Sequence, residues 1–420
     1  MIALLNYAIH LLLCISWQSC ATFLMTMQKT KSVYFSEIDH AVQQPLSEQR
    51  TLRVLLVTPR YFPYMGGVEN HAYQIARRLA QAGVDVTVLT TDVSGRLPAI
   101  EQLDGVKIQR VRAWPAKRDY YFAPDIYRVI TQGRWDIIHV MPYHTLVAPL
   151  AMLAALRAKI PYAVTFHGGG HSSRLRNALR GLQLALLRPL LAHAERLVAT
   201  ARFEIGFFGE RLHLSEERFV FIPNGSDLAA VVKPAPTTTK QTLIAAVGRL
   251  ERYKGHQRIL AAMPKILEQR PDVRLWIAGT GPYESTLRRM AKRLGVDDCV
   301  EIRAIPAEDR QAMASELSKA ALMILLSEYE THPMAVLEAL AVGCPALVAD
   351  TSGLHELAEE GFVSAIPLKS TPDEVATAVL HQLCEPLVVP RLTLPTWDNC
   401  ADDLLTLYRN MSRKKGVQSS

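Results

Sequence analysis

The sequence predicts an α/β protein with two doubly wound domains, each a mostly parallel sheet covered by helices. Short apolar, β-branched runs alternate with helical patterns from Thr51 onward. This alternation stops at the Pro/Thr-rich residues 233–241 and starts again at Thr242. Strands buried on both faces form continuous apolar runs, as these do, and alternating strands and helices imply parallel sheets. Ligands bind beyond the carboxyl ends of such strands, so we expect function in the loops that follow them, in a cleft between the two domains.

In the first domain (51–232), helix His71–Gln81 ends before Gly83. The strands expected there are Arg53–Thr58, Asp85–Thr90, Asp136–Val140, Tyr162–Phe166, Arg196–Thr200 and Phe219–Ile222. In the second domain (242–394), they are Thr242–Val247, Arg274–Ala278, Val300–Arg303, Ala320–Leu326, Ala346–Ala349 and Ser364–Pro367. A helix over Trp397–Met411, within 395–412, closes the fold, and 413–420 is expected to be a frayed basic tail.

The composition excludes several classes of protein. A chain of 420 residues with 49% hydrophobic and 21% charged residues is neither disordered nor collagenous. The net charge of +7 permits anionic partners such as nucleotides, phospholipids and sugar phosphates, but it does not indicate nucleic-acid binding. The six cysteines form no Cys-x-x-Cys pair, which argues against structural zinc and favours a reducing, cytoplasmic setting.

Residues 1–50 are expected to be an apolar segment followed by a linker. Residues 1–28 carry no charged side chain, and three explanations remain open. A membrane anchor with Lys29 and Lys31 on its C-terminal flank would keep the main body in the cytoplasm. A secretory signal lacks a basic start and a clear cleavage site. An unstructured extension, or an upstream start codon with Met25 or Met27 as the working start, is the interpretation we favour.

Two loops of the second half carry basic and glycine residues. Arg249 and Lys254 follow the strand Thr242–Val247 closely and could clamp a diphosphate, although solvated surface cations would have the same sequence pattern. The next strand ends in the Gly-Thr-Gly-Pro of 279–282, where Gly281 would let the backbone approach a ligand near a helix start.

The stretch 327–345 combines a helix start with two carboxylates. Pro333 suits a first helical position, and a helix over Met334–Val342 would direct its early amides, Met334 to Val336, at a phosphate. Glu330 lies before this helix and Glu338 on it, and a carboxylate accepts hydrogen bonds well from vicinal hydroxyls. The alternative is one carboxylate favoured by the helix dipole and one exposed helical Glu.

The first half offers weaker signals. Gly66 and Gly67 open a helix without the Gly-x-Gly-x-x-Gly pattern, which counts against nicotinamide binding. His167 ends a strand ahead of three glycines and is a candidate polar contact. Between Arg174 and Arg202 lie six arginines and one acid, with leucines at helical spacing. Such a stretch can contact an anionic membrane or a phosphorylated acceptor, or be an exposed helix packed by its leucines.

Four motifs in order resemble glycosyltransferase family 4. They are Glu330 and Glu338 with seven residues between them, GRL-x-x-x-KG at 248–255, GTGP at 279–282 and IPNG at 222–225. The similarity runs from about Arg53 to Tyr408. It implies the GT-B fold, in which two Rossmann-like domains face across a cleft and a C-terminal helix crosses back to the first domain. It also implies sugar transfer from a nucleotide diphosphate with retention of configuration and without a bound metal.

The resemblance also implies roles for individual residues. Arg249 and Lys254 would hold the donor diphosphate, Glu338 the ribose hydroxyls and Glu330 the donor sugar. His167 and Glu330 are thus the expected catalytic-site residues. The expected donor-binding residues are Gly66, Gly67, Arg249, Lys254, Gly281, Thr331, His332, Met334, Ala335 and Glu338.

The chain departs from the family pattern at Thr331-His332-Pro333, where many members have glycines. Leu326 and Ala304 also replace a common proline and a common glycine, so the donor base and sugar stay open. The expected partners are a nucleotide-sugar donor and a saccharide or lipid-linked acceptor, with peripheral membrane contact and no nucleic acid. Cell-surface polysaccharide or glycolipid synthesis is the expected setting. A nucleotide-sugar epimerase, an inactive nucleotide-sugar-binding protein and a nicotinamide oxidoreductase are the rival functions.

Overall fold

The computed structural model describes residues 51–64, 66–115, 121–167, 174–226, 241–306, 309–388 and 393–418, without the side chains of 174–180 and 414–418. The segment 1–50, the glycines 168–170 and most of the linker 233–241 lie outside this part of the chain. Within the described residues, none of the helices has the length and apolar character needed to cross a membrane.

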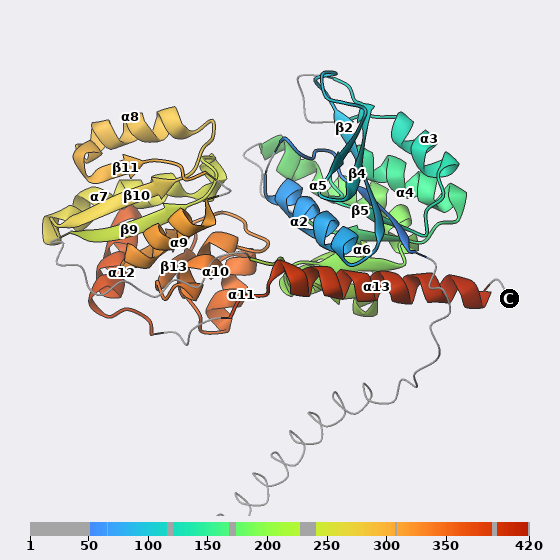
Figure 1. Cartoon of the computed structure of the whole chain (residues 1–420). Helices are drawn as coiled ribbons and strands as arrows, with labels where there is room; N and C mark the ends of the chain where they lie inside the picture. Colours follow the sequence, from blue (N-terminus) through green and yellow to red (C-terminus); the bar gives the residue numbers. More distant parts are fainter. Residues whose placement is uncertain are drawn as a thin grey trace, which may run out of the picture. The chain divides into compact units, whose positions relative to one another are not determined.

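The first half of the chain forms an eight-stranded sheet (Figure 1). Its spatial order is β3-β4-β2-β1-β5-β6-β7-β8, and every neighbouring pair except β3 and β4 is parallel. The strands are β1 Arg53–Val57, β2 Asp85–Asp92, β3 Ile100–Leu103, β4 Val106–Arg112, β5 Ile137–Val140, β6 Tyr162–Thr165, β7 Arg196–Ala199 and β8 Phe219–Phe221. The helices are α2 Gly67–Gln81, α3 Asp125–Gln132, α4 Val147–Ala158, α5 Arg174–His193 and α6 Phe203–Leu212.

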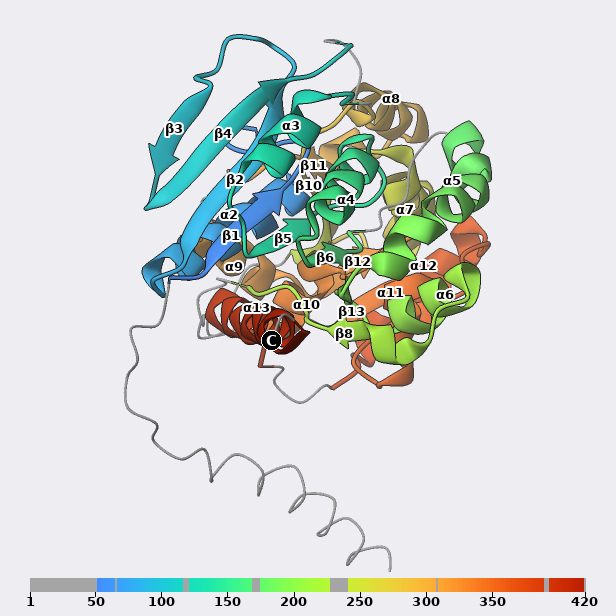
Figure 2. The same ribbon diagram turned by 90° about the vertical axis from the view of Figure 1, so that its right-hand side faces the viewer.

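The sheet has an edge hairpin, formed by β3 and β4, that was not among the strands predicted from sequence (Figure 2). β3 has the sequence IEQL and is partly exposed along its length, so it has no apolar run to mark it. The turn does have a recognisable signal. Asp104 and Gly105 both have positive φ, 51° and 79°, as a two-residue Asp-Gly hairpin turn requires.

The second half forms a six-stranded, fully parallel sheet of order β11-β10-β9-β12-β13-β14. The strands are β9 Thr242–Val247, β10 Val273–Ala278, β11 Val300–Ile302, β12 Leu322–Leu325, β13 Ala346–Ala349 and β14 Ser364–Ile366. The helices are α7 His256–Gln269, α8 Glu284–Leu294, α9 Arg310–Lys319, α10 Met334–Ala341, α11 Ser352–Glu359 and α12 Pro372–Cys384.

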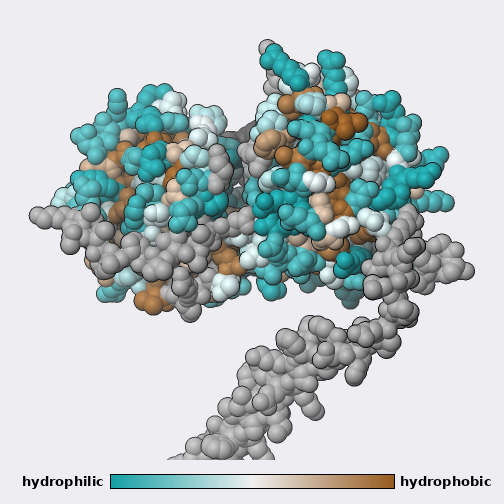
Figure 3. Space-filling model, in the orientation of Figure 1, coloured by the Kyte–Doolittle hydropathy of each residue, from teal (hydrophilic) through white to brown (hydrophobic). Residues whose placement is uncertain are grey.

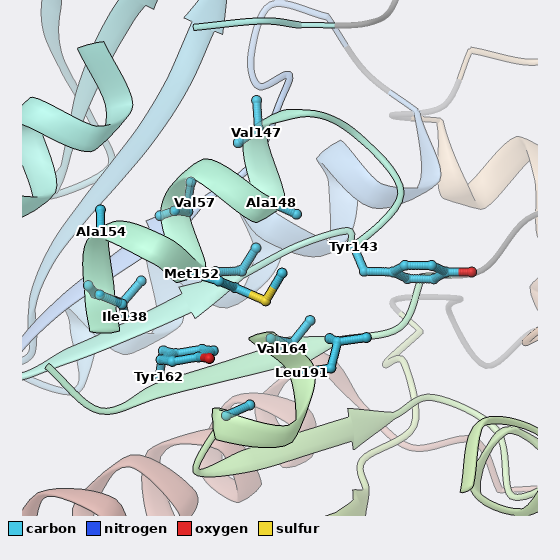
Figure 4. Close-up of a cluster of buried hydrophobic side chains, with 14 of the residues drawn as sticks. Val57, Ile138, Tyr143, Val147, Ala148, Met152, Ala154, Tyr162, Val164 and Leu191 are labelled. Atoms are coloured by element: carbon cyan, nitrogen blue, oxygen red, sulfur yellow. The ribbon is translucent and has the colours of Figure 1, made fainter. Parts of the chain in front are cut away.

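Both sheets are covered by helices on both faces, which confirms the predicted doubly wound α/β class. One face of the first sheet packs against α3 to α6, and Figure 4 shows Val57 and Ile138 of the strands beside Val147 and Met152 of α4. In the second half, α7, α8 and α12 pack on one face and α9, α10 and α11 on the other. Figure 3 shows hydrophilic residues over most of the visible surface of both halves, with smaller hydrophobic patches.

The C-terminal helix α13, Trp397–Gln418, belongs to the core of the first half. Its Trp397, Leu404 and Tyr408 are buried with strand β1 and helix α2. The expectation of a frayed tail from residue 413 is wrong, because the helix continues to Gln418. Lys and Arg are good helix formers, and their positive charge is favourable near a helix C-terminus.

Candidate functional site

The loops after β9 and β10 are joined by backbone hydrogen bonds. The amides of Gly248, Leu250 and Tyr283 donate to Ala278, Thr280 and Leu250 carbonyls, all at 2.9 Å. A Cβ added at Gly281 would lie 2.4 Å from the Leu250 carbonyl oxygen, so only glycine fits there. Close packing against Leu250 therefore requires glycine at position 281, and this contact helps to place the loop that carries Arg249.

Gly255 places Lys254 at the end of β12. It has φ +79°, and a Cβ at this position would lie 1.9 Å from the Leu326 carbonyl oxygen. The amide of Glu328 donates to the Tyr253 carbonyl at 2.7 Å, which ties the same two segments together. The basic loop and the loop after β12 therefore form one rigid junction.

Lys254 and Glu330 meet as an ion pair at this junction. Lys254 Nζ lies 2.8 Å from Glu330 Oε1 and 2.9 Å from Oε2, and the two side chains are only 16% and 10% exposed. Ser327 Oγ donates to Glu330 Oε1 at 2.5 Å. The loop after β13 holds the backbone of Glu330: its amide donates to Ser352 Oγ at 2.9 Å, and its carbonyl accepts from the Gly353 amide at 3.0 Å. A donor diphosphate at Lys254 would share this ammonium group with Glu330.

Arg249, the other predicted diphosphate ligand, has a 65% exposed side chain. Its guanidinium forms an ion pair with Glu251 at 2.8 Å and donates to the Tyr253 hydroxyl at 3.2 Å. It lies on the same loop as Lys254 but makes different contacts. An incoming anion would lose less of its own hydration at the exposed Arg249 than at the enclosed Lys254.

Glu338 is enclosed on α10, with a side chain 11% exposed. Its Oε1 accepts from the guanidinium of Arg310 on α9, and Ser226 Oγ lies 3.4 Å from the same oxygen. Ser226 follows the IPNG motif, and its amide donates to the Pro395 carbonyl at 2.9 Å. Glu338, which the resemblance predicts to bind the ribose, is thus held by two residues that belong to none of the four motifs.

The start of α10 differs from the prediction. Pro333 precedes the helix instead of opening it, with φ −77° and ψ 71°. This turn lets the Met334 amide donate to the His332 carbonyl at 2.8 Å, while the Val336 amide donates to the Pro333 carbonyl at 2.9 Å. Two of the three amides expected to face a phosphate therefore have backbone acceptors, and a phosphate there would compete with them. The helix also ends at Ala341, one residue earlier than expected.

The glycine loop of the first half carries an acid that was not among the predicted site residues. Gly67 is the first residue of α2, and a Cβ there would meet nothing within 4 Å. At Gly66 a Cβ would lie 2.5 Å from Oε2 of Glu69, whose carboxylate folds back over the loop. The Glu69 carboxylate, which also pairs with Arg60 at 3.6 Å, therefore covers Gly66, while the space at Gly67 stays open.

His167 lies beside the buried His71, and His167 and His332 are themselves partly buried. Its ring centroid is 4.4 Å from that of His71 on α2, in an edge-on arrangement. Among the described residues, His167 Nε2, His332 Nε2 and both ring nitrogens of His71 have no hydrogen-bond partner, and nor does Asn224 Oδ1 of the IPNG motif. Burial lowers the pKa of His71 and of His332 to about 4 each, so these rings are neutral at pH 7. Neutral imidazoles can both donate and accept hydrogen bonds, which suits sugar hydroxyls.

Elements of the two halves also contact one another near these residues. The Glu356 carboxylate of α11 accepts from the amides of Arg202 and Phe203, at 3.3 and 3.2 Å, where α6 begins. The rings of Phe203 and Tyr329 are 6.3 Å apart. Tyr329 directly precedes Glu330, so this contact lies next to the carboxylate that binds Lys254.

Six residues of the site were not predicted from sequence: Arg310, Ser226, Ser327, Ser352, His71 and Glu69. The arginine and the serines follow a strand end or open a helix, but their pairing joins segments distant in sequence, as with Arg310 and Glu338. Four of them had a motif nearby to mark them: Ser226 directly follows IPNG, Ser327 opens the stretch 327–345, and Glu69 and His71 lie two and four residues after Gly67. Among the described residues, there is no cluster of three or more His, Cys, Asp or Glu side chains that could hold a metal ion.

Comparison with known proteins identifies the family. The sequence model of glycosyltransferase family 4 matches residues 65–230, and that of glycosyl transferases group 1 matches 231–384. A D-inositol 3-phosphate glycosyltransferase of Nocardiopsis dassonvillei is 26% identical over 399 residues, covering 82% of this chain and 89% of that protein. The GDP-mannose:cellobiosyl-diphosphopolyprenol alpha-mannosyltransferase of Komagataeibacter xylinus is 25% identical, covering 86% and 94%.

Solved structures show the same fold. Sucrose-phosphate synthase of Thermosynechococcus elongatus superimposes with a TM-score of 0.64 at 19% identity, over 88% of this chain and 98% of that one. Anabaena HepE, solved with UDP and glucose, superimposes with a TM-score of 0.62 at 16% identity, over 88% and 100%. The fold is therefore GT-B, and the chain is a glycosyltransferase that belongs to glycosyltransferase family 4.

Proposed function

We propose that this enzyme transfers a sugar, with retention of configuration, from a nucleoside-diphosphate sugar to a hydroxyl of a saccharide or lipid-linked acceptor. The observation that supports this most is the enclosed Lys254–Glu330 pair next to the start of α10. This contact supports the proposal, because a diphosphate requires a cation and sugar hydroxyls require an acceptor such as a carboxylate. Anabaena HepE, which shares the fold, has been solved with UDP-glucose, and this supports a nucleotide-sugar donor here.

In this proposal the main catalytic device is neutralisation of the departing diphosphate. Lys254, Arg249 and the backbone at the start of α10 would stabilise the negative charge that develops as the sugar–phosphate bond breaks. Glu330 orients the donor sugar, and His167 contacts it from the first half. The acceptor hydroxyl attacks on the face that the diphosphate leaves: its oxygen bonds to the anomeric carbon, the bond from that carbon to the phosphate oxygen breaks, and the hydroxyl proton passes to that oxygen. No metal ion takes part.

We also propose that the enzyme works at a membrane surface in cell-surface polysaccharide or glycolipid synthesis. Exposed leucines on the first half support this contact: Leu153 on α4 and Leu182 and Leu186 on α5 are 50%, 59% and 71% exposed. The Komagataeibacter relative is named for a diphosphopolyprenol acceptor. Sedimentation with anionic and neutral lipid vesicles tests the proposal, which requires binding that prefers the anionic ones.

The donor is best tested with a thermal-shift panel of UDP-, GDP- and ADP-sugars. A ligand at a hundredfold its Kd stabilises the folded state by about 2.7 kcal/mol, which such a panel resolves. We expect one base to give a clear shift and the others much smaller ones. NMR of the product formed from that donor then reports the anomeric configuration. A panel without any shift, or an inverted product, would refute the proposal. Sugar interconversion without an acceptor would point to an epimerase.

A further inference from the structure

Arg310 occupies a position that helix stability does not explain. It is the first residue of α9, and a positive charge there is unfavourable because the helix dipole is positive at its N-terminus. The helix start is already fixed by Asp309, whose carboxylate accepts from the Ala312 amide at 2.9 Å. The contact that accounts for Arg310 lies outside its helix, at Glu338 of α10.

The Glu338 carboxylate is held on one oxygen from two directions. The Arg310 guanidinium and Ser226 Oγ both bond to Oε1, the second at 3.4 Å. In the described part of the chain, Oε2 takes no hydrogen bond from a protein group. This arrangement fixes the side chain and leaves acceptor capacity on one oxygen.

An enclosed carboxylate near a diphosphate needs a compensating charge. Burial and nearby negative charge both favour the protonated form of a carboxyl group. A protonated carboxyl has lost part of its acceptor capacity, whereas an ionised one can accept from two hydroxyls at once. Arg310, with a side chain 31% exposed, supplies the positive charge beside this carboxylate.

We propose that Arg310 is a positioning residue for recognition of the nucleotide ribose. It holds Oε1 of Glu338 and so orients the carboxylate with Oε2 toward the ribose hydroxyls. This proposal rests on the proposed function, because it requires a nucleotide donor at Glu338. It deepens that function by naming the residue through which the site distinguishes a ribonucleotide from its deoxy counterpart.

The test compares each of UDP, GDP and ADP with its 2′-deoxy form by calorimetric titration of the full chain. Hydrogen bonds to charged groups predict that the wild-type protein binds the preferred ribonucleotide about 10- to 100-fold more tightly than the deoxy form. In Arg310→Gln we expect this ratio to fall to within about threefold, as in Glu338→Gln. Arg310→Lys, which keeps the charge without the planar fork, should give an intermediate ratio.

Arg128→Gln is the matched control, because it removes an exposed arginine–carboxylate pair (Arg128–Asp125, 3.4 Å) in the first half. Its ratio should equal that of the wild type. If Arg310→Gln weakens both forms equally and keeps the ratio, Arg310 acts on the phosphates or on folding, and the positioning role is refuted. If the wild-type protein binds no nucleotide, the proposed function fails instead.

Discussion

Near the site, the two halves present different kinds of ionisable group. In the second half, Lys254 with Glu330 and Arg310 with Glu338 form enclosed ion pairs, and each carboxylate has further hydrogen bonds. In the first half, His71 and His167 are kept neutral by burial, which lowers the pKa of both, and they have ring nitrogens without a partner among the described residues. At the site, the second half therefore carries charge in compensated pairs, and the imidazoles of His71 and His167, together with His332 of the second half, offer unused hydrogen-bonding capacity.

This difference suggests a division of labour in catalysis. Ion pairs that are already formed cost little reorganisation when a charged diphosphate arrives, and they give strong binding through electrostatics. Neutral imidazoles bind phosphate weakly but can hydrogen-bond to the hydroxyls of a sugar or an acceptor. We therefore expect second-half substitutions to affect donor affinity and first-half substitutions to affect turnover.

Removing the Lys254 charge should have the largest effect. Lys254→Met should lower kcat/KM by about 100- to 1,000-fold, because it removes a cation from the developing diphosphate charge and leaves Glu330 without its partner. Steady-state kinetics with the preferred donor measure the loss. Lys292→Met, an exposed lysine on α8, should remain within about twofold of the wild type as the control. A similar small change for Lys254→Met would contradict the account.

Replacing His167 should separate turnover from binding. His167→Gln should lower kcat by about 10- to 100-fold and leave the Kd for the nucleoside diphosphate nearly unchanged, because in the proposed mechanism the ring contacts the sugar and not the phosphates. Kinetics and calorimetry on the same variant give both values. Loss of diphosphate affinity with unchanged kcat would show that the two halves are not divided in this way.

A pair of glycines tests how rigidly each half places its loop. Gly255→Ala should lower the free energy of unfolding by about 3 kcal/mol or more, since its Cβ would lie 1.9 Å from the Leu326 carbonyl oxygen and φ is +79°. Gly67→Ala should change it by less than about 1 kcal/mol, because the space around Gly67 is open. Urea denaturation measures both. Equal effects would mean that the two loops are equally constrained.

A further prediction concerns a first-half acid that burial keeps uncharged. Burial raises the pKa of Glu204 from its ordinary value of 4.5 to about 8. Between these pH values the folded state binds more protons than the unfolded state, so this group makes stability fall as pH rises from 4.5 to 8. Glu204→Gln should flatten that part of the pH dependence in urea denaturation. An unchanged slope would show that Glu204 is ionised in the folded protein.

Much of the fold could be predicted from local sequence. Buried parallel strands are marked by apolar runs, and the stretches between these runs are long enough to form the helices that alternate with them. The β3–β4 hairpin does not follow in this way, since an edge strand such as Ile100–Leu103 buries little and carries no such run. For the site, motif spacing pointed to Lys254, Glu330 and Glu338. The Arg310–Glu338 pair and the His71–His167 contact depend on how distant segments pack, which spacing along the chain does not encode.

The central claim is that a nucleoside diphosphate binds the second half through Arg249 and Lys254. Titration calorimetry with UDP, GDP and ADP tests it on the wild-type protein and on the Arg249→Ala/Lys254→Met double variant. We predict that one diphosphate binds the wild type, and that its affinity falls at least about 100-fold in the double variant. Equal affinity in both proteins, or no binding to the wild type, would contradict the claim.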